Sequence, residues 1–273
     1  MSQEWPSIAA LTASAAERFG TAPAVIDGDV TTSFAELDEE ARRFGAALVA
    51  TGVQPDDRVA IWAFNCREWI VADLGIQQAG ATLVPVNTRF KGIEAATVLA
   101  RAHVKALVTV TDFLGNDYLG MLASSGIELP DLTTTVIARG SSRDGALDWD
   151  AFLATATPEG LAEVDRRRAE RRPTDPADLL FTSGTTGTPK GVIASQSQSM
   201  AVGIDWVRMA GLVPGDRYLQ LNPYFHMFGL KGGILACLAS GATMLPVPVF
   251  DIDAVLALVA SHHVSVLPGA PTV

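Results

Sequence analysis

The stretch FTSGTTGTPKG, residues 181–191, combines glycines and hydroxyl side chains with a single lysine, Lys190. It follows the largely apolar run 177–180 and precedes a second apolar segment, residues 192–194. Glycine lets successive backbone N–H groups turn toward one point, hydroxyl groups add hydrogen-bond donors, and lysine adds a positive charge suited to phosphate. The stretch therefore predicts an anion-binding loop between two strands.

The spacing of this loop differs from two other phosphate-binding motifs. The nucleotide-binding P-loop needs G-x-x-x-x-G-K-[ST], whereas here Gly184 and Lys190 are too close, Pro189 precedes the lysine and Gly191 follows it. A dinucleotide fingerprint, G-x-G-x-x-G, does not occur in the chain. A flexible surface loop without a ligand is the general alternative for a loop rich in glycine and threonine.

Composition limits the class of protein. The 273 residues allow one large domain or two ordinary ones, and 48% apolar residues are enough for a sizeable core. The net charge of −10 disfavours binding to nucleic acid or to an anionic membrane. The arginine-rich run 166–172 has no interleaved aromatic residues, so it indicates a solvated helix end or linker rather than a nucleic-acid site.

Several features favour a cytoplasmic location. Cys66 and Cys237 lie far apart and have neither a disulfide nor a zinc spacing, which predicts buried free thiols. The first ten residues lack the basic start and apolar stretch of a signal peptide. Residues 232–250 carry no charge, but glycines and prolines interrupt them, so we expect no membrane span.

Short apolar runs alternate with helical patterns along most of the chain. Residues 24–32 predict a hairpin, and Ser33 with Glu36 predicts a capping box at the start of a helix. Further strands are expected at 58–63, 82–86, 106–110, 135–137, 218–221, 243–245 and 264–267. Further helices are expected at 68–79, 93–102, 198–210, 230–238 and 252–261. This alternation predicts an α/β protein with largely parallel sheets.

Two segments do not follow this alternation. Residues 156–176 are charged, aperiodic and bounded by prolines, which predicts a surface linker. The last residues, 271–273, come directly after the expected strand 264–267. An α/β domain does not normally stop there, so we expect this polypeptide to be the front part of a longer protein.

Residues 182–191 closely resemble the phosphate loop of the adenylate-forming enzymes, which are the acyl- and aryl-CoA ligases, the luciferases and the adenylation domains of peptide synthetases. Three further stretches are similar to this family in order and spacing. They are residues 30–48 (VTTSFAELDEEARRFGAAL), residues 80–90 (GATLVPVNTRF) and residues 223–229 (PYFHMFG). The resemblance covers essentially the whole chain.

The resemblance implies two stacked, mostly parallel sheets flanked by helices, as in the N-terminal portion of this fold. Residues 58–205 would form a first α/β subdomain that carries the phosphate loop. Residues 1–57 would combine with residues 206–273 in a second, discontinuous subdomain. The remaining part of the N-terminal domain and the small C-terminal domain would lie outside this chain.

The resemblance also implies an ATP-dependent acyl-CoA ligase (AMP-forming), with Mg²⁺ accompanying ATP. A carboxylate attacks the α-phosphate to give an acyl adenylate and pyrophosphate, and the thiol of coenzyme A then displaces AMP. The residues for adenine, Mg²⁺ and the adenylation lysine would lie beyond Val273, so we expect the isolated 273-residue polypeptide to be inactive and to bind ATP weakly.

Individual roles follow from the same resemblance. Lys190 and His226 are the expected catalytic residues, His226 acting as a gate beside the carboxylate and the pantetheine tunnel. The expected phosphate cradle consists of Thr182, Ser183, Gly184, Thr185, Thr186, Gly187 and Lys190. The expected acyl pocket consists of His226, Met227, Phe228, Lys231 and Gly269. For a lone histidine or an apolar pair, a local structural role is the alternative.

The sequence leaves substrate and assembly open. The stretch 222–238 together with LPGAPTV, residues 267–273, most resembles actinobacterial ligases for steroid-derived propanoate side chains, such as an indane-dione propanoate. A fatty or aryl acid, or a non-catalytic nucleotide-binding module, are the alternatives. The apolar run 264–267 favours self-association, so a homodimer stays open beside a monomer.

Overall fold

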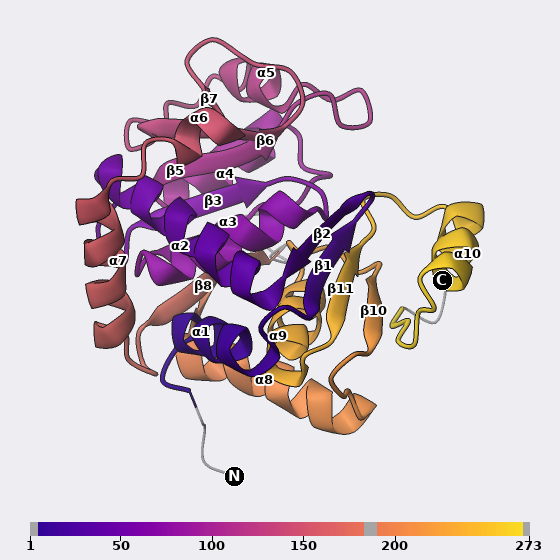
Figure 1. Cartoon of the computed structure of the whole chain (residues 1–273). Coiled ribbons are helices and arrows are strands. Elements are labelled where there is room, and N and C mark those ends of the chain that lie inside the picture. The colour runs from indigo at the N-terminus through magenta and orange to yellow at the C-terminus, as the bar shows by residue number, and fades with distance from the viewer. Residues whose placement is uncertain (1–4, 183–189, 270–273) are drawn as a thin grey trace.

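Two β-sheets organise the chain in the computed structural model, which describes residues 5–182 and 190–269 (Figure 1). The sheets contain seven and four strands. Helices cover both sheets, so the α/β architecture with two mostly parallel sheets that we expected is confirmed.

The larger sheet is built from the middle of the chain. Its strands run in the spatial order β7 (Leu147–Asp148), β6 (Thr134–Arg139), β5 (Val104–Val110), β3 (Arg58–Trp62), β4 (Thr82–Pro85), β8 (Pro176–Thr182) and β9 (Lys190–Ser195). Neighbouring strands are parallel except for the antiparallel pair β8 and β9. The carboxyl ends of six strands therefore share one edge of the sheet.

The smaller sheet joins segments from the two ends of the chain. Its spatial order is β10 (Arg217–Gln220), β11 (Thr243–Pro246), β1 (Pro23–Asp27) and β2 (Val30–Ser33). Strands β1 and β2 form the expected antiparallel hairpin, and the other two pairings are parallel. The assignment of residues 1–57 and 206–273 to a separate subdomain stays a prediction.

Helices lie between and around the sheets (Figure 1). They are α1 (Ile8–Phe19), α2 (Phe34–Ala50), α3 (Arg67–Gln78), α4 (Gly92–Arg101), α5 (Tyr118–Ala123), α6 (Trp149–Leu153), α7 (Pro158–Glu170), α8 (Gln196–Ala210), the π-helix η1 (Phe228–Leu235), α9 (Ala236–Ser240) and α10 (Ile252–Ser261). Helix α3 contacts β3 and β4 of the larger sheet and β1 of the smaller one. This helix is therefore the layer that holds the sheets together.

The position of α3 explains its composition and its glycine. Every residue from Trp69 to Gln78 is buried, because the helix is covered on all sides. At Gly75 a Cβ atom would lie 2.6 Å from the ring of Phe44 and 2.8 Å from the carbonyl oxygen of Ala41. Glycine thus permits the close approach of α2 and α3.

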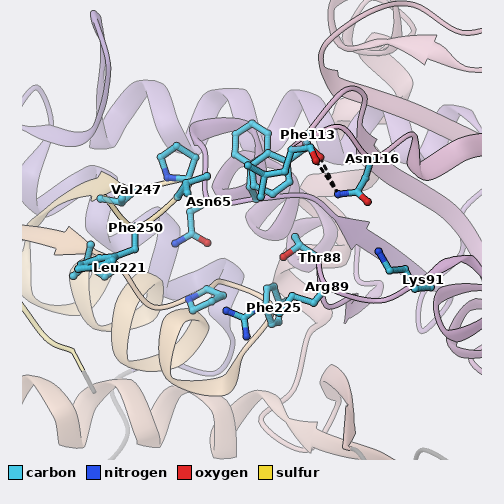
Figure 2. Close-up of a pocket in the computed structure, with 15 residues that line it drawn as sticks. Asn65, Thr88, Arg89, Lys91, Phe113, Asn116, Leu221, Phe225, Val247 and Phe250 are labelled. Atoms are coloured by element: carbon cyan, nitrogen blue, oxygen red, sulfur yellow. Dashed lines mark hydrogen bonds between the residues drawn. The ribbon is translucent and has the colours of Figure 1, made fainter. Parts of the chain in front are cut away.

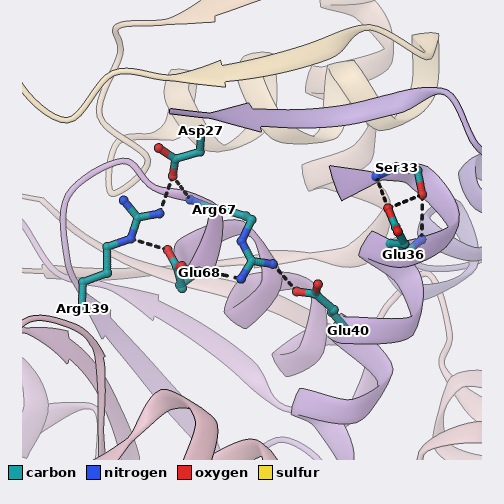
Figure 3. A network of polar contacts seen from close by, with 7 residues as sticks. All are labelled: Asp27, Ser33, Glu36, Glu40, Arg67, Glu68 and Arg139. Carbon is teal, nitrogen blue, oxygen red and sulfur yellow. Dashed lines mark hydrogen bonds and ion pairs between the residues drawn. The ribbon is translucent and has the colours of Figure 1, made fainter. Parts of the chain in front are cut away.

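A polar network near the surface also joins the sheets, and we call it the outer junction (Figure 3). Arg139, at the end of β6, donates to Asp27 Oδ2 at 2.5 Å and to Glu68 Oε2 at 2.6 Å. The backbone N–H of Arg67 donates to Asp27 Oδ2 at 2.8 Å, and its guanidinium contacts Glu40. The network fixes the β1–β2 hairpin to the start of α3.

The prediction of a surface linker at 156–176 is wrong, because most of this segment is helix α7. Thr157 caps the helix by accepting from Gly160 N at 3.1 Å, and Pro158 occupies the first turn. Arg167 is buried and donates to the carbonyl oxygens of Val53 and Ala79 at 2.9 and 3.0 Å. Two arginines that we expected in solvent, Arg167 and Arg171, are therefore part of the packed structure.

The strand expected at 264–267 is also absent from the part of the chain that the structure describes. Only an isolated parallel bridge joins Val266 to Tyr218 of β10. Val264 and Val266 are half-buried, while Ser265 and Leu267 are exposed. Side-chain burial therefore alternates as in a strand, although no continuous ladder of hydrogen bonds forms.

Candidate active site

The two strands that flank the glycine- and threonine-rich loop form a hairpin. Thr182, the last residue of β8, pairs with Lys190, the first residue of β9. Strand β8 runs parallel to β4, so the hairpin connection follows the carboxyl end of a parallel strand. Lys190 is exposed.

Most of the predicted phosphate cradle lies outside the described residues. Ser183, Gly184, Thr185, Thr186 and Gly187 belong to this part of the chain, and only its two ends are described.

The predicted gate residue, His226, lies in a turn after the carboxyl end of β10. Its backbone N–H donates to the carbonyl oxygen of Pro223 at 3.0 Å, and its own carbonyl oxygen accepts from Leu230 N at 3.0 Å. At Gly229 a Cβ atom would lie 2.1 Å from the Pro223 carbonyl oxygen, so the turn requires glycine there. The imidazole is exposed, and its Nδ1 accepts from Phe228 N at 3.4 Å.

Asn65 fastens this turn to the larger sheet, and we did not identify it from the sequence. Its Nδ2 donates to the carbonyl oxygens of Gln220 and Asn222 at 3.0 Å each, and its Oδ1 accepts from Tyr224 N at 2.9 Å. Asn65 is 5% exposed and follows the carboxyl end of β3. Its place directly after a buried strand was the only signal for it in the sequence.

The structure brings most of the predicted acyl-pocket residues to this region. Met227 is 49% exposed, and the ring of Phe228 packs edge-on against Trp206 at 4.9 Å. Gly269 is exposed and follows Pro268, whose carbonyl oxygen accepts from Asn222 Nδ2 at 3.3 Å. Residues 268–269 therefore lie beside the turn that carries His226.

Lys231 differs from the other predicted pocket residues because its ammonium is buried in an ion pair. Its Nζ lies 3.1 Å from Asp178 Oδ1, and the two side chains are 4% and 2% exposed. Ser199 of α8 donates to the other oxygen of Asp178 at 2.5 Å. We call Asp178, Lys231 and Ser199 the inner junction, because they join β8 of the larger sheet to the helices η1 and α8. A role of Lys231 in the acyl pocket stays a prediction.

Burial perturbs the pKa values of nearby groups. It raises the pKa of the Asp73 carboxyl to about 7, because burial desolvates the charged form. A hydrogen bond from Gln77 lowers this pKa in part, and the like charge of Asp178 raises it further. Burial also raises the pKa of the thiols of Cys66 and Cys237, which are buried and free as expected. These thiols are therefore unreactive at neutral pH.

A pocket of about 480 Å³ opens next to the His226 turn, between the carboxyl edges of both sheets (Figure 2). Its lining residues follow strands β3, β4, β5, β10 and β11. They include Phe64, Asn65, Arg89, Lys91, Phe113, Leu221, Phe225 and Phe250. The rings of Phe64 and Phe113 stack at 4.5 Å, and Arg89 and Lys91 add positive charge to the pocket lining. The sequence analysis missed this pocket, although ligands commonly bind at the carboxyl ends of parallel strands.

Neither a metal cluster nor a membrane-spanning helix occurs among the described residues. Within residues 5–182 and 190–269, no group of three or more His, Cys, Asp or Glu side chains is arranged to hold a metal ion. In the same described ranges, no helix is long and apolar enough to cross a membrane.

The fold and the site define an α/β protein whose β8–β9 hairpin, histidine turn and pocket follow the carboxyl ends of strands in two sheets. The chain belongs to the AMP-binding enzyme family, whose sequence profile matches residues 12–273.

Its relatives include ligases for a steroid-derived acid. A 3-[(3aS,4S,7aS)-7a-methyl-1,5-dioxo-octahydro-1H-inden-4-yl]propanoyl:CoA ligase of Rhodococcus jostii (strain RHA1) is 45% identical over 95% of this chain and 51% of its own length. The Mycobacterium tuberculosis ligase of the same name is 42% identical over 92% of this chain and 48% of its own length. The chain thus spans about half the length of these curated relatives.

A solved structure supports the fold. The anthranilate CoA ligase AuaEII in complex with anthranoyl-AMP superposes with a TM-score of 0.84 at 22% identity, over 95% of this chain and 48% of the other. At this identity the similarity concerns the fold alone.

Proposed function

We propose that this chain is the nucleotide- and acid-binding part of an ATP-dependent acyl-CoA ligase. The proposed substrate is a steroid-derived propanoate of the indane-dione type, ATP and coenzyme A being the co-substrates. The names of the two relatives at 45% and 42% identity support this choice. Mg²⁺ would enter together with ATP, as the MgATP substrate.

The observation that carries the proposal is that three features follow the carboxyl ends of strands in the two sheets. The β8–β9 hairpin, the His226 turn and the pocket of about 480 Å³ all follow carboxyl ends of parallel strands, and Asn65 bonds the turn to the larger sheet. A reaction that joins a nucleotide to an acid needs both binding regions side by side.

In the first proposed step, a carboxylate oxygen of the acid attacks the α-phosphorus of ATP. The bond from this phosphorus to the bridging oxygen breaks, and pyrophosphate leaves. Lys190, with the hydroxyl and N–H groups of residues 182–187, would stabilise the charge that passes to pyrophosphate. Fixed positive charge at the leaving group lowers the barrier of this step.

In the second proposed step, the sulfur of coenzyme A attacks the acyl carbon, AMP leaves and the thiol proton is released. His226 would lie between the acyl group and the entering thiol. Arg89 and Lys91 at the neighbouring pocket supply the charge that the phosphates of coenzyme A need. The apolar residues Met227 and Phe228, with Gly269, would contact the acyl group.

A substrate panel tests the proposal with the complete polypeptide that the gene encodes. Indane-dione propanoate, a medium-chain fatty acid and an aryl acid are compared by pyrophosphate release and by the mass of the thioester. We expect kcat/KM for the indane-dione propanoate to be about ten-fold or more above the others. A preference for another acid would refute the substrate, and the absence of acid-dependent pyrophosphate release would refute the ligase.

A further inference from the structure

Lys231 is a buried lysine, and burial of a charged ammonium group destabilises a protein unless the charge is compensated. Taking an ammonium out of water is unfavourable unless a paired charge compensates for it. Lys231 lies in the π-helix η1, five residues before the apolar helix α9 begins, and its only ion pair among the described residues is with Asp178. π-helical segments often occur at functional sites.

The two residues of this pair lie on two elements next to the proposed site, strand β8 and the π-helix η1. Asp178 lies on β8, the strand that ends at Thr182 and continues into the phosphate loop. Lys231 lies in the helix that begins directly after Met227, next to His226. The pair is therefore a direct charged contact between the strand before the loop and the helix after the histidine turn.

Further contacts fix η1 on its other sides. Tyr218 of β10 donates through its hydroxyl to the carbonyl oxygen of Gly232 at 2.9 Å. Helix α8 approaches so closely that a Cβ at Gly203 would lie 2.8 Å from the Lys231 carbonyl oxygen. Ser199, from the same helix, holds the second oxygen of Asp178. A shift of β8 must therefore displace η1 or break the ion pair.

We propose that Asp178 and Lys231 are positioning residues that couple strands β8 and β9 to the His226 turn. This inference rests on the proposed function for its kinetic consequence, but the mechanical coupling is independent of it. Neither residue needs to touch a substrate. Because the pair joins β8 to η1, a displacement of β8 would also displace the His226 turn.

Hydrogen exchange tests the coupling without any activity measurement. In the complete polypeptide, Asp178→Asn should make amides of residues 223–230 exchange about five-fold faster or more, although Asp178 lies in the other sheet. Lys231→Met should have the same effect on β8 and β9. The matched control is Asp165→Asn, which breaks the bonds of Asp165 with Arg42 at 2.6 and 2.8 Å on the surface of α2 and α7. The control should change neither region.

Kinetics of pyrophosphate release then test the consequence. A loss of folded enzyme lowers kcat alone, whereas a positioning defect also changes KM. We expect Lys231→Met to raise KM for ATP and Asp178→Asn to raise KM for the acid, each about five-fold or more. The double variant should raise each KM no further than the single variants do, because both substitutions break one contact.

The outcomes separate the two proposals. Exchange that stays local to each substitution, or KM values that stay at the wild-type level, would overturn the coupling. A wild-type protein without acid-dependent pyrophosphate release would overturn the proposed function, and the exchange measurement would still decide the coupling.

Discussion

The outer and inner junctions both join the two sheets with charged side chains, but they differ in exposure. Arg139 of the outer junction is 36% exposed, and its partners Asp27 and Glu68 have additional contacts with Arg67. The inner junction has side chains that are 2% and 4% exposed. Water can replace a lost partner in the outer junction, whereas in the inner junction a lost partner leaves a buried charge.

The largest effect on stability is expected from Lys231→Met. Removing one member of a buried pair leaves Asp178 charged and uncompensated, so the free energy of unfolding should fall by about 3–5 kcal/mol. The double variant Asp178→Asn/Lys231→Met leaves no buried charge and should recover most of this loss. Urea unfolding of the three variants measures both effects, and a single variant as stable as wild type would show that the pair is not energetically coupled.

The second expected effect concerns pH and Asp73. Its pKa of about 7 in the folded protein, against an ordinary value of 3.8, means that the folded state holds this proton more tightly than the unfolded state. Stability is therefore lost as pH rises from about 4 through about 7.

Asp73→Asn removes this titration and tests the assignment. Relative to wild type, the variant should gain stability on the order of 4 kcal/mol between pH 4 and pH 8. Thermal unfolding at the two pH values measures the difference. An equal offset from wild type at both values would contradict a raised pKa of this carboxyl.

Arg139→Gln should lower the free energy of unfolding less than Lys231→Met does. Asp27 keeps its bond from Arg67 N, and solvent reaches the site, so we expect a loss of about 1–2 kcal/mol. The loss should diminish with added salt, because exposed charges are screened. A loss as large as that of Lys231→Met would remove the distinction between the junctions.

The smallest effect is expected at Ser33, which caps α2 beside the outer junction (Figure 3). Its hydroxyl accepts from Glu36 N at 3.2 Å, and the Glu36 carboxylate accepts from Ser33 N at 2.8 Å. Ser33→Ala should destabilise the protein by about 1 kcal/mol, and Ser33→Gly by less. Chemical denaturation compares the two, and equal losses would argue against a capping role of the hydroxyl.

Local signals in the sequence predicted much of the fold correctly. The capping box at Ser33 and the hairpin of β1 and β2 depend on residues close together in the chain, and both are present. Helix α7 was missed because residues 156–176 are charged, aperiodic and bounded by prolines, which suggested a surface linker. Its apolar contacts are few, and the bonds of Arg167 to Val53 and Ala79 depend on segments far away in the chain.

The site was less predictable for the same physical reason. Motif resemblance indicated Lys190 and His226, whose roles stay predictions. Asn65 and the Asp178–Lys231 pair make contacts between segments that lie far apart in the chain, and no spacing in the sequence predicts these contacts. Lys231 looked like a pocket residue because it follows the histidine motif, whereas its ammonium contacts β8.

The most direct test of the proposed chemistry compares two lysines in the complete polypeptide. Lys190 is at the carboxyl edge, beside the loop, and Lys105 is near the amino end of β5, 3.7 Å from Asp131. Pyrophosphate release with ATP and the indane-dione propanoate is measured for Lys190→Ala and Lys105→Ala. We expect a roughly ten- to thousand-fold lower rate of pyrophosphate release for Lys190→Ala with unchanged folding, and a wild-type rate for Lys105→Ala. Wild-type pyrophosphate release by Lys190→Ala would contradict this expectation.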